Sequence, residues 1–175
     1  MTAADELKPF IRDVPDFPKP GIVFKDITPL LLSPEALARS IELLAEPFRD
    51  AGVTRVAAIE ARGFIFGSCV ARALGAGFVP IRKPRKLPWT THSHEYALEY
   101  GTDTLEIHRD ALTSADRVLL VDDLLATGGT LGAAIELVGL LGARLVGIAT
   151  VIELEFLGGR QKLSTQAPIH TLIQY

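Results

Sequence analysis

One thirteen-residue stretch, Val118-Leu-Leu-Val-Asp-Asp-Leu-Leu-Ala-Thr-Gly-Gly-Thr130, constrains the fold more than any other part of the chain. Its apolar start, 118–121, predicts a buried strand that ends at Asp122-Asp123. Apolar residues then recur at helical spacing from Thr130 to Leu141, and Gly142 predicts the end of that helix. A buried strand that runs through a glycine turn directly into a helix indicates one unit of a parallel α/β sheet.

The rest of the chain repeats this alternation. Ser33 and Pro34 are typical of the first residues of a helix, which we expect to end near Gly52. The other expected elements are strands over 56–59, 78–81 and 145–152 and a helix over about 66–74 that ends at Gly75. This order predicts an α/β fold with a parallel sheet and helices on both faces, and in such sheets ligands bind beyond the carboxyl ends of the strands.

Length and charge limit the organisation of the chain and its class of partner. The 175 residues predict a single domain over 1–175. The net charge of −3 argues against broad binding to nucleic acid or to an anionic membrane. The single cysteine and the absence of a signal-peptide pattern at the N-terminus lead us to expect a cytoplasmic protein.

Two segments depart from the strand-helix pattern. The first 32 residues are rich in proline, which makes long regular elements improbable there. Residues 82 to 104 are basic at their start and hold few aliphatic side chains, so we expect an exposed loop or hairpin that works as a flexible lid.

The residues of the 118–130 stretch suit a sugar phosphate. Gly128 and Gly129 let the backbone turn tightly, and the N-terminus of the following helix attracts an anion. Thr127 and Thr130 add hydroxyl donors, so the turn suits one phosphate monoester. The paired carboxylates just before it would repel that phosphate but suit vicinal hydroxyls or a cation. Ribose 5-phosphate satisfies both halves.

This stretch resembles the signature that binds phosphoribosyl pyrophosphate (PRPP) in the type I phosphoribosyltransferases, and its particular form resembles the members of that family that use adenine. Further segments match in order: Phe17-Pro-Lys-Pro-Gly-Ile-Val-Phe-Lys-Asp26, Glu60-Ala-Arg-Gly-Phe64, Arg82-Lys-Pro-Arg-Lys-Leu-Pro88 and Leu98-Glu-Tyr-Gly101. The resemblance implies a small hood from the first 32 residues or so, a lid over about 82–104 and a homodimer.

The resemblance also implies roles for individual residues. Residues 126–130 would hold the 5-phosphate, Asp122 and Asp123 the ribose hydroxyls, and Arg62 the pyrophosphate. The full set expected to bind PRPP is Arg62, Arg82, Lys83, Lys86, Asp122, Asp123, Ala126, Thr127, Gly128, Gly129 and Thr130. In dimers of the family, part of the basic patch comes from the neighbouring subunit.

For the base, the resemblance implies a stack on Phe24, with the backbone of Val23 and Lys25 reading its edge and Leu154 on the other side. Enzymes of the family that use 6-oxopurines carry an aspartate at the position of Ala126, which here has only a methyl group. The acid or base must then come from elsewhere, and the resemblance implies Glu99, which matches the family's candidate, as the catalytic residue.

The implied reaction takes adenine and PRPP to AMP and pyrophosphate. Magnesium is expected to bind mainly through the oxygens of PRPP and pyrophosphate, with no dedicated set of protein ligands. Two alternatives stay open: a phosphoribosyltransferase for another purine base, and a PRPP-sensing regulator that binds DNA. Ala126 and the Phe24 segment argue against the first, and the negative net charge argues against the second.

Overall fold

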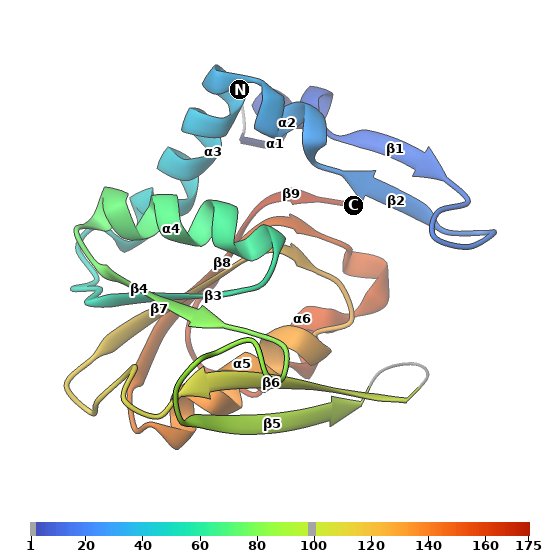
Figure 1. The fold of residues 1–175 in the computed structure, drawn as a ribbon. Helices are drawn as coiled ribbons and strands as arrows, with labels where there is room; N and C mark the ends of the chain where they lie inside the picture. The colour runs from blue at the N-terminus through green and yellow to red at the C-terminus, as the bar shows by residue number, and fades with distance from the viewer. Residues whose placement is uncertain (1–2, 98–100) are drawn as a thin grey trace.

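A five-stranded parallel sheet forms the centre of the protein in a computed structural model that describes residues 3–97 and 101–175 (Figure 1). The strand order is β4-β3-β7-β8-β9, and every neighbouring pair is parallel. The strands are β3 (Arg55–Ile59), β4 (Gly77–Ile81), β7 (Arg117–Leu125), β8 (Arg144–Glu153) and β9 (Ile169–Gln174). The predicted α/β fold with a parallel sheet is confirmed.

Helices cover both faces of this sheet, as predicted. Helices α3 (Pro34–Ala45) and α4 (Arg62–Leu74) lie on one face and α5 (Gly129–Leu140) on the other (Figure 1). Strand β7 divides its side chains between the two, because successive side chains of a strand point to opposite faces. Leu119 and Val121 join the apolar cluster that contains α4, while Val118 and Leu120 join the one that contains α5.

The ends of the helices follow the predicted signals at Ser33, Gly75 and Gly142, whereas α3 ends at Ala45 and not near Gly52. Ser33 caps α3, since its side chain accepts a hydrogen bond from the backbone N–H of Ala36. Gly75 ends α4 in a left-handed conformation with φ of 65°.

Two predicted boundaries are wrong at the sheet edge that carries the charged residues. Helix α4 begins at Arg62 rather than near residue 66, so Arg62 and Gly63 are helical and not part of a loop. A Cβ on Gly63 would lie 2.6 Å from Oδ1 of Asp122, so the first turn of α4 packs directly on β7. Strand β7 continues through Asp122 and Asp123 to Leu125, because β8 pairs with it as far as Glu153.

The proline-rich start of the chain forms short elements above the sheet. An antiparallel hairpin, β1 (Arg12–Pro15) and β2 (Val23–Asp26), projects to one side, and α2 (Thr28–Leu32) connects it to α3 (Figure 1). Helix α1 (Ala3–Leu7) and the 3₁₀ helix η1 (Lys8–Phe10) complete this part, and a further 3₁₀ helix, η2 (Glu46–Phe48), directly follows α3. Short elements are what the prolines predict.

Residues 82–104 are more regular than a long irregular loop. Strands β5 (Thr91–Ala97) and β6 (Thr102–His108) pair as an antiparallel hairpin, and β5 lies along α5 (Figure 1). Leu105 and Ile107 of β6 are fully buried in the cluster that contains α5, which fixes the hairpin on the body of the protein. Among the described residues of this segment, those that lack a regular element are 82–90, which precede β5, and Gly101.

After β8 the chain forms the 3₁₀ helix η3 (Glu155–Leu157) and the short helix α6 (Gly159–Lys162) before it enters β9. Within the described residues, no helix is long and apolar enough to span a membrane.

Candidate active site

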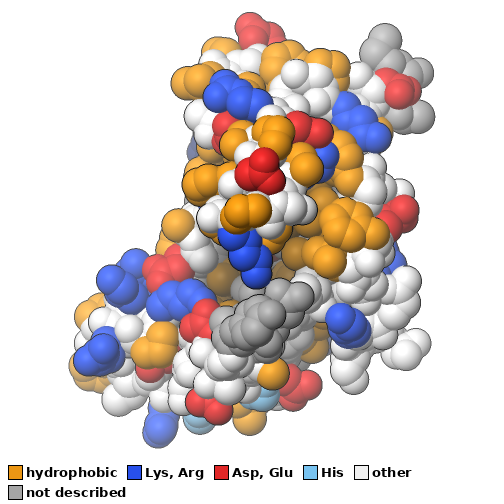
Figure 2. Space-filling model, turned by 90° about the vertical axis from the view of Figure 1, so that its right-hand side faces the viewer, with side chains coloured by type: hydrophobic (Ala, Val, Ile, Leu, Met, Phe, Trp, Pro, Cys, Tyr) orange, Lys and Arg blue, Asp and Glu red, His pale blue; other side chains and the backbone are white. Residues whose placement is uncertain are grey.

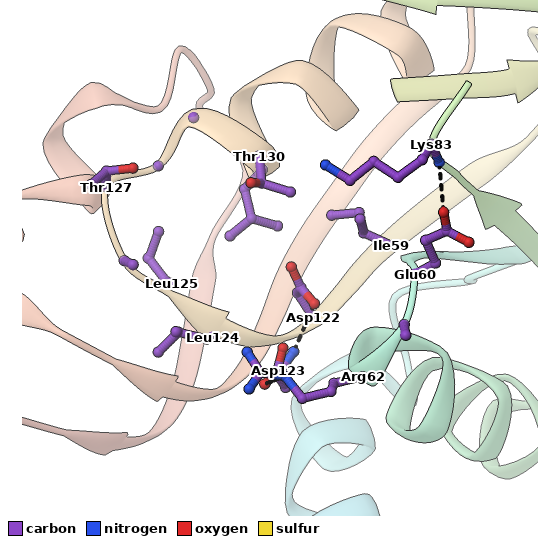
Figure 3. Close-up of a pocket in the computed structure, with 15 residues that line it drawn as sticks. Ile59, Glu60, Arg62, Lys83, Asp122, Asp123, Leu124, Leu125, Thr127 and Thr130 are labelled. Atoms are coloured by element: carbon purple, nitrogen blue, oxygen red, sulfur yellow. Dashed lines mark hydrogen bonds and ion pairs between the residues drawn. The ribbon is translucent and has the colours of Figure 1, made fainter. Parts of the chain in front are cut away.

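The carboxyl ends of β3 and β7 enclose a cavity of about 360 Å³. Figure 3 shows the loop with Thr127 and Thr130 at one end and the two aspartates below it, while Arg62 reaches in from the start of α4 and Lys83 from the segment after β4. The lining residues are Ile59, Glu60, Ala61, Arg62, Lys83, Asp122, Asp123, Leu124, Leu125, Ala126, Thr127, Gly128, Gly129, Thr130 and Leu131.

The loop 126–130 forms the N-terminus of α5. Gly128 has φ of 86°, a conformation that side chains with a Cβ rarely adopt, and its carbonyl accepts the first helical hydrogen bond from the N–H of Gly132 at 2.8 Å. The N–H groups of the first turn have no partner within the helix, so they are available to an anion in the cavity. The hydroxyl of Thr130 lies 3.4 Å from that of Tyr96 on β5.

The two aspartates are buried where β7 meets the cavity, with exposed fractions of 8% for Asp122 and 5% for Asp123. The backbone N–H of Asp123 donates to Oδ1 of Asp122 at 2.9 Å. Burial, and then the negative charge of Asp123, raise the pKa of Asp122 well above its ordinary value. Burial also raises the pKa of Asp123, although Arg62 opposes that shift. Both carboxyls are therefore harder to ionise in the free protein than exposed aspartates are.

Arg62 connects three parts of the site. Its Nε lies 2.8 Å from Oδ2 of Asp123, and its guanidinium lies 5.3 Å from the ring centroid of Phe24 on β2. The structure thus brings together a residue predicted to bind pyrophosphate, one predicted to bind ribose and one predicted to stack on the base.

A second basic group follows β4. Lys83 lines the cavity, and its ammonium group pairs with Asp103 on β6. Glu60 holds this segment in place, since it accepts a hydrogen bond from the N–H of Lys83 at 2.9 Å and pairs with Nε of Arg82 at 2.6 Å. The peptide bond between Glu60 and Ala61 is cis.

Arg82 and Lys86 are not among the described residues that line the cavity. Besides its pairing with Glu60, Arg82 donates from Nη1 to the carbonyl of Lys86 at 3.1 Å, so the two residues support the segment around Lys83. Their predicted contact with PRPP stays a prediction.

The residues predicted to bind the base lie beside the cavity rather than in its lining. The ring of Phe24 meets that of Phe17 edge to face at 5.2 Å, and Val23 is 48% exposed. The side chain of Lys25 turns away to Asp13, at 2.7 Å, which leaves its backbone for the predicted contact. Leu154 follows β8, and its N–H donates to the carbonyl of Leu125 at 2.9 Å. Glu99, the predicted catalytic residue, lies outside the described residues.

Sequence reasoning assigned no role to three residues that the structure places around the site: Glu60, Tyr96 and Asp103. Glu60 begins the segment 60–64 that matches the family, and this match could have pointed to it. Tyr96 and Asp103 reach the site only through the pairing of β5 with β6. Among the described residues, no group of three or more His, Cys, Asp or Glu side chains is arranged to hold a metal ion.

Comparison with known proteins agrees with this geometry. The family model described as "Phosphoribosyl transferase domain" matches residues 27–170. Among curated proteins, the adenine phosphoribosyltransferase of Koribacter versatilis is 57% identical over 171 residues, which cover 98% of this chain and 93% of that protein.

Solved structures extend the comparison to the fold. The adenine phosphoribosyltransferase of Rhodothermus marinus superimposes with a TM-score of 0.94 at 54% identity, covering 99% of this chain and 98% of that one. The Saccharomyces cerevisiae enzyme, complexed with adenine and an imino-altritol bisphosphate, gives 0.91 at 41% identity, covering 98% of both chains. With such matches over nearly its whole length, the chain belongs to the phosphoribosyl transferase family, and these relatives within the family are adenine phosphoribosyltransferases.

Proposed function

We propose that the protein transfers the 5-phosphoribosyl group of PRPP to adenine, giving AMP and pyrophosphate. The observation that carries this proposal is the cavity itself, in which a helix N-terminus with two threonines lies beside a buried pair of aspartates. A sugar with a phosphate at one end and a free diol at the other matches those two features. Adenine is inferred as the base from the relatives that are named as adenine phosphoribosyltransferases.

The 5-phosphate would occupy the loop 126–130, where backbone N–H groups and the hydroxyls of Thr127 and Thr130 converge. The 2- and 3-hydroxyls of the ribose would then donate to Asp122 and Asp123. Hydroxyl donors supply the hydrogen bonds that these buried carboxylates need to stay ionised.

The pyrophosphate would leave toward Arg62 and Lys83, with Arg82 and Lys86 behind them. Negative charge develops on the leaving oxygen as the bond between it and C1 of the ribose breaks, and fixed cations stabilise that charge. Arg62 and Lys83 reach the cavity from different elements, so they can meet the diphosphate from two sides.

The protein offers Asp122 and Asp123 but, within the described residues, no larger cluster of ligands, and this donor set fits a magnesium ion bound mainly through oxygens of the substrate. Such an ion neutralises charge on the diphosphate when it is bound. Arg62 and Lys83 would add to that neutralisation.

The base would stack on Phe24 with Leu154 opposite, and the backbone of Val23 and Lys25 would read its edge. N9 of adenine forms the new bond to C1 as pyrophosphate departs, and the proton of the imidazole ring must be removed. Ala126 has no group that can accept it, so we assign this step to Glu99. Glu99→Leu is expected to lower kcat by more than about tenfold, and unchanged turnover would remove Glu99 from the mechanism.

The decisive assay incubates the protein with PRPP, Mg²⁺ and, in separate reactions, adenine, hypoxanthine, guanine and xanthine, and detects the nucleotide formed. AMP formation from adenine alone is expected. Product from a 6-oxopurine instead would favour the alternative, a phosphoribosyltransferase for another base. A crystal structure with AMP gives a second test, because the proposal requires its phosphate to lie against Thr127 and Gly128.

A PRPP-sensing regulator that binds DNA receives no support from the surface. On the face drawn in Figure 2, lysine and arginine side chains are interspersed with acidic ones, whereas duplex binding requires a continuous basic patch. A homodimer and a cytoplasmic location stay predictions. Light scattering on the purified protein would test the first and imaging of the tagged protein in cells the second.

A further inference from the structure

A short turn at 158–159 lies in backbone contact with the loop 126–130, called the phosphate loop because it is proposed to bind the 5-phosphate. A Cβ added to Gly159 would lie 2.1 Å from the carbonyl oxygen of Ala126 and 2.9 Å from the nitrogen of Gly128. A Cβ added to Gly128 would in turn lie 2.7 Å from the carbonyl oxygen of Gly159. The two segments therefore touch with no room for a methyl group, although Gly159 does not line the cavity.

An ion pair fixes the position of this turn. The Nε of Arg160 donates to Oε1 of Glu153 at 2.9 Å, and its Nη2 pairs with Oε2 of the same carboxylate. Nη1 donates to the carbonyl of Ile169 at 3.0 Å, and the hydroxyl of Thr171 donates to Oε2 of Glu153 at 3.2 Å. The guanidinium of Arg160, the residue after Gly159, thus connects this turn to the end of β8 and the start of β9.

The carboxylate of this ion pair is buried, with Glu153 only 3% exposed, while the side chain of Arg160 is 33% exposed. Hydrogen bonding to Arg160 is the main reason that the pKa of Glu153 lies below its ordinary value. A buried carboxylate with a bidentate arginine has a single favourable geometry, which suits it to hold a segment in one place.

The same stretch reaches the other end of the site. Glu153 lies opposite Leu125 in the pairing of β8 with β7, and the next residue, Leu154, donates from its N–H to the carbonyl of Leu125. The phosphate loop begins immediately after Leu125. A continuous series of contacts therefore connects Leu154, which is predicted to contact the base, through Glu153 and Arg160 to the loop 126–130.

We propose that Gly159 and the Glu153–Arg160 ion pair are positioning residues that set the location of loop 126–130 and hence the affinity of the site for a 5-phosphate. The inference rests on the proposed function, because it assumes that this loop binds the phosphate of PRPP. It extends the site to residues that touch no substrate and that act through the backbone of Ala126 and Gly128.

Gly159→Ala tests the proposal directly. The added methyl group must displace the loop, and a displacement of about 1 Å at a binding site can cost up to a hundredfold. We expect the KM for PRPP and the Kd for AMP to rise by at least about tenfold, while the Kd for inorganic pyrophosphate changes little. The matched control is Gly139→Ala on α5, where a Cβ would meet nothing within 4 Å, and it should leave every constant unchanged.

Arg160→Lys and Arg160→Gln test the ion pair. They also test the proposal if Gly159→Ala does not fold. Lysine keeps the charge without the bidentate geometry, so it should recover part of the affinity for AMP that glutamine loses. A purely structural role predicts a lower Tm with equal weakening of AMP and pyrophosphate, and that result would overturn the proposal. Unchanged affinity for AMP in all variants would also overturn it.

Binding of ribose 5-phosphate, measured by calorimetry without adenine, separates this inference from the proposed function. If the unmodified protein binds ribose 5-phosphate but forms no AMP, the proposed function is wrong. A loss of that binding in Gly159→Ala and its retention in Gly139→Ala would still support the positioning role.

Discussion

The Nε of Arg62 lies 2.8 Å from Oδ2 of Asp123, and the two residues come from different elements, the start of α4 and the end of β7. Among the described residues, Arg62 is the one cation that forms an ion pair with either buried aspartate. Its charge opposes the effect of burial on the pKa of Asp123. The proposed reaction would use Arg62 for pyrophosphate and Asp123 for ribose. Each group thus holds the other in the cavity before the substrate arrives.

Removal of Arg62 should therefore impair the site in two ways. Arg62→Ala deletes a cation for the diphosphate and leaves Asp123 buried without its counter-charge, which raises the pKa of Asp123 further. We expect kcat/KM for PRPP to fall by about a hundredfold, the size of loss seen when one charge-stabilising group is removed from an active site. Steady-state kinetics would measure it.

The control is Arg72→Ala, which removes an exposed arginine from the last turn of the same helix. It should leave kcat/KM within about twofold, since surface substitutions away from special features have small effects. Similar losses in both variants would point to a general effect of charge and not to the pair with Asp123.

Binding of PRPP should depend on pH through the aspartate pair. In the free protein, burial raises the pKa of both carboxyls, and the ribose diol favours their ionised forms because hydroxyls donate to carboxylates. A ligand that prefers the ionised form releases protons when it binds, so the affinity should fall as the pH drops through the raised pKa of Asp122.

Calorimetric titration of PRPP in buffers of different ionisation enthalpy would detect those protons. Asp122→Asn removes the group and should reduce the release. An affinity for PRPP that shows no pH dependence beyond that of its own phosphate groups, whose last proton is lost at about pH 6, would contradict the assignment of the diol to this pair.

Asp122→Asn should stabilise the fold while it weakens catalysis. The folded-state pKa of Asp122 is raised, so the folded protein favours the protonated form, and the cost of ionisation appears as the pH rises above the unfolded value of about 3.9. Asparagine is neutral at every pH, and its amide oxygen can keep the hydrogen bond from the N–H of Asp123.

The variant should therefore melt a few degrees higher near pH 7.5, on the order of 2–4 °C for a gain of about 1 kcal/mol in a chain of this size. The difference should shrink as the pH falls through the unfolded value and disappear at about pH 3, where Asp122 is protonated in both states. Differential scanning calorimetry at the two pH values measures both effects. Equal or lower Tm at pH 7.5 would show that burial of this carboxylate does not cost stability.

The sequence predicted the central part of this structure well because local signals and tertiary packing agree there. The apolar run at 118–121 and the glycines at 128 and 129 both favour the same structure, a buried strand that turns tightly into a helix. The same agreement holds at Ser33 and Gly75, where the side-chain cap and the left-handed glycine mark helix ends.

Predictions were wrong where packing outweighs local preference. The charged run Glu60-Ala61-Arg62-Gly63 after the strand indicates a loop, yet the missing Cβ of Gly63 allows α4 to approach Asp122 and the helix begins at Arg62. Partners that depend on the pairing of distant strands, such as Asp103 with Lys83, leave no local signal in the sequence. The role of Gly159 likewise follows only from its contact with Ala126.

Asp103 is expected to lower the affinity of the site for pyrophosphate. In the free protein it pairs with the ammonium group of Lys83, and Tyr96 donates to the same carboxylate at 3.3 Å. Burial is the largest single influence and lowers the pKa of Lys83, but hydrogen bonding and charge from Asp103 and Tyr96 together outweigh it, so the net shift is upward and Lys83 stays charged. A diphosphate that binds Lys83 must therefore compete with Asp103.

Asp103→Asn removes the competitor and keeps the shape of the side chain. The Kd of pyrophosphate should fall by a few-fold, on the scale of about 1 kcal/mol for a partly exposed ion pair, and kcat should decrease where release of pyrophosphate limits turnover. In a Lys83→Ala background the same substitution should change the Kd much less, because its effect acts through the ammonium group. A similar gain in both backgrounds would mean that Asp103 repels the diphosphate directly and does not act by holding Lys83.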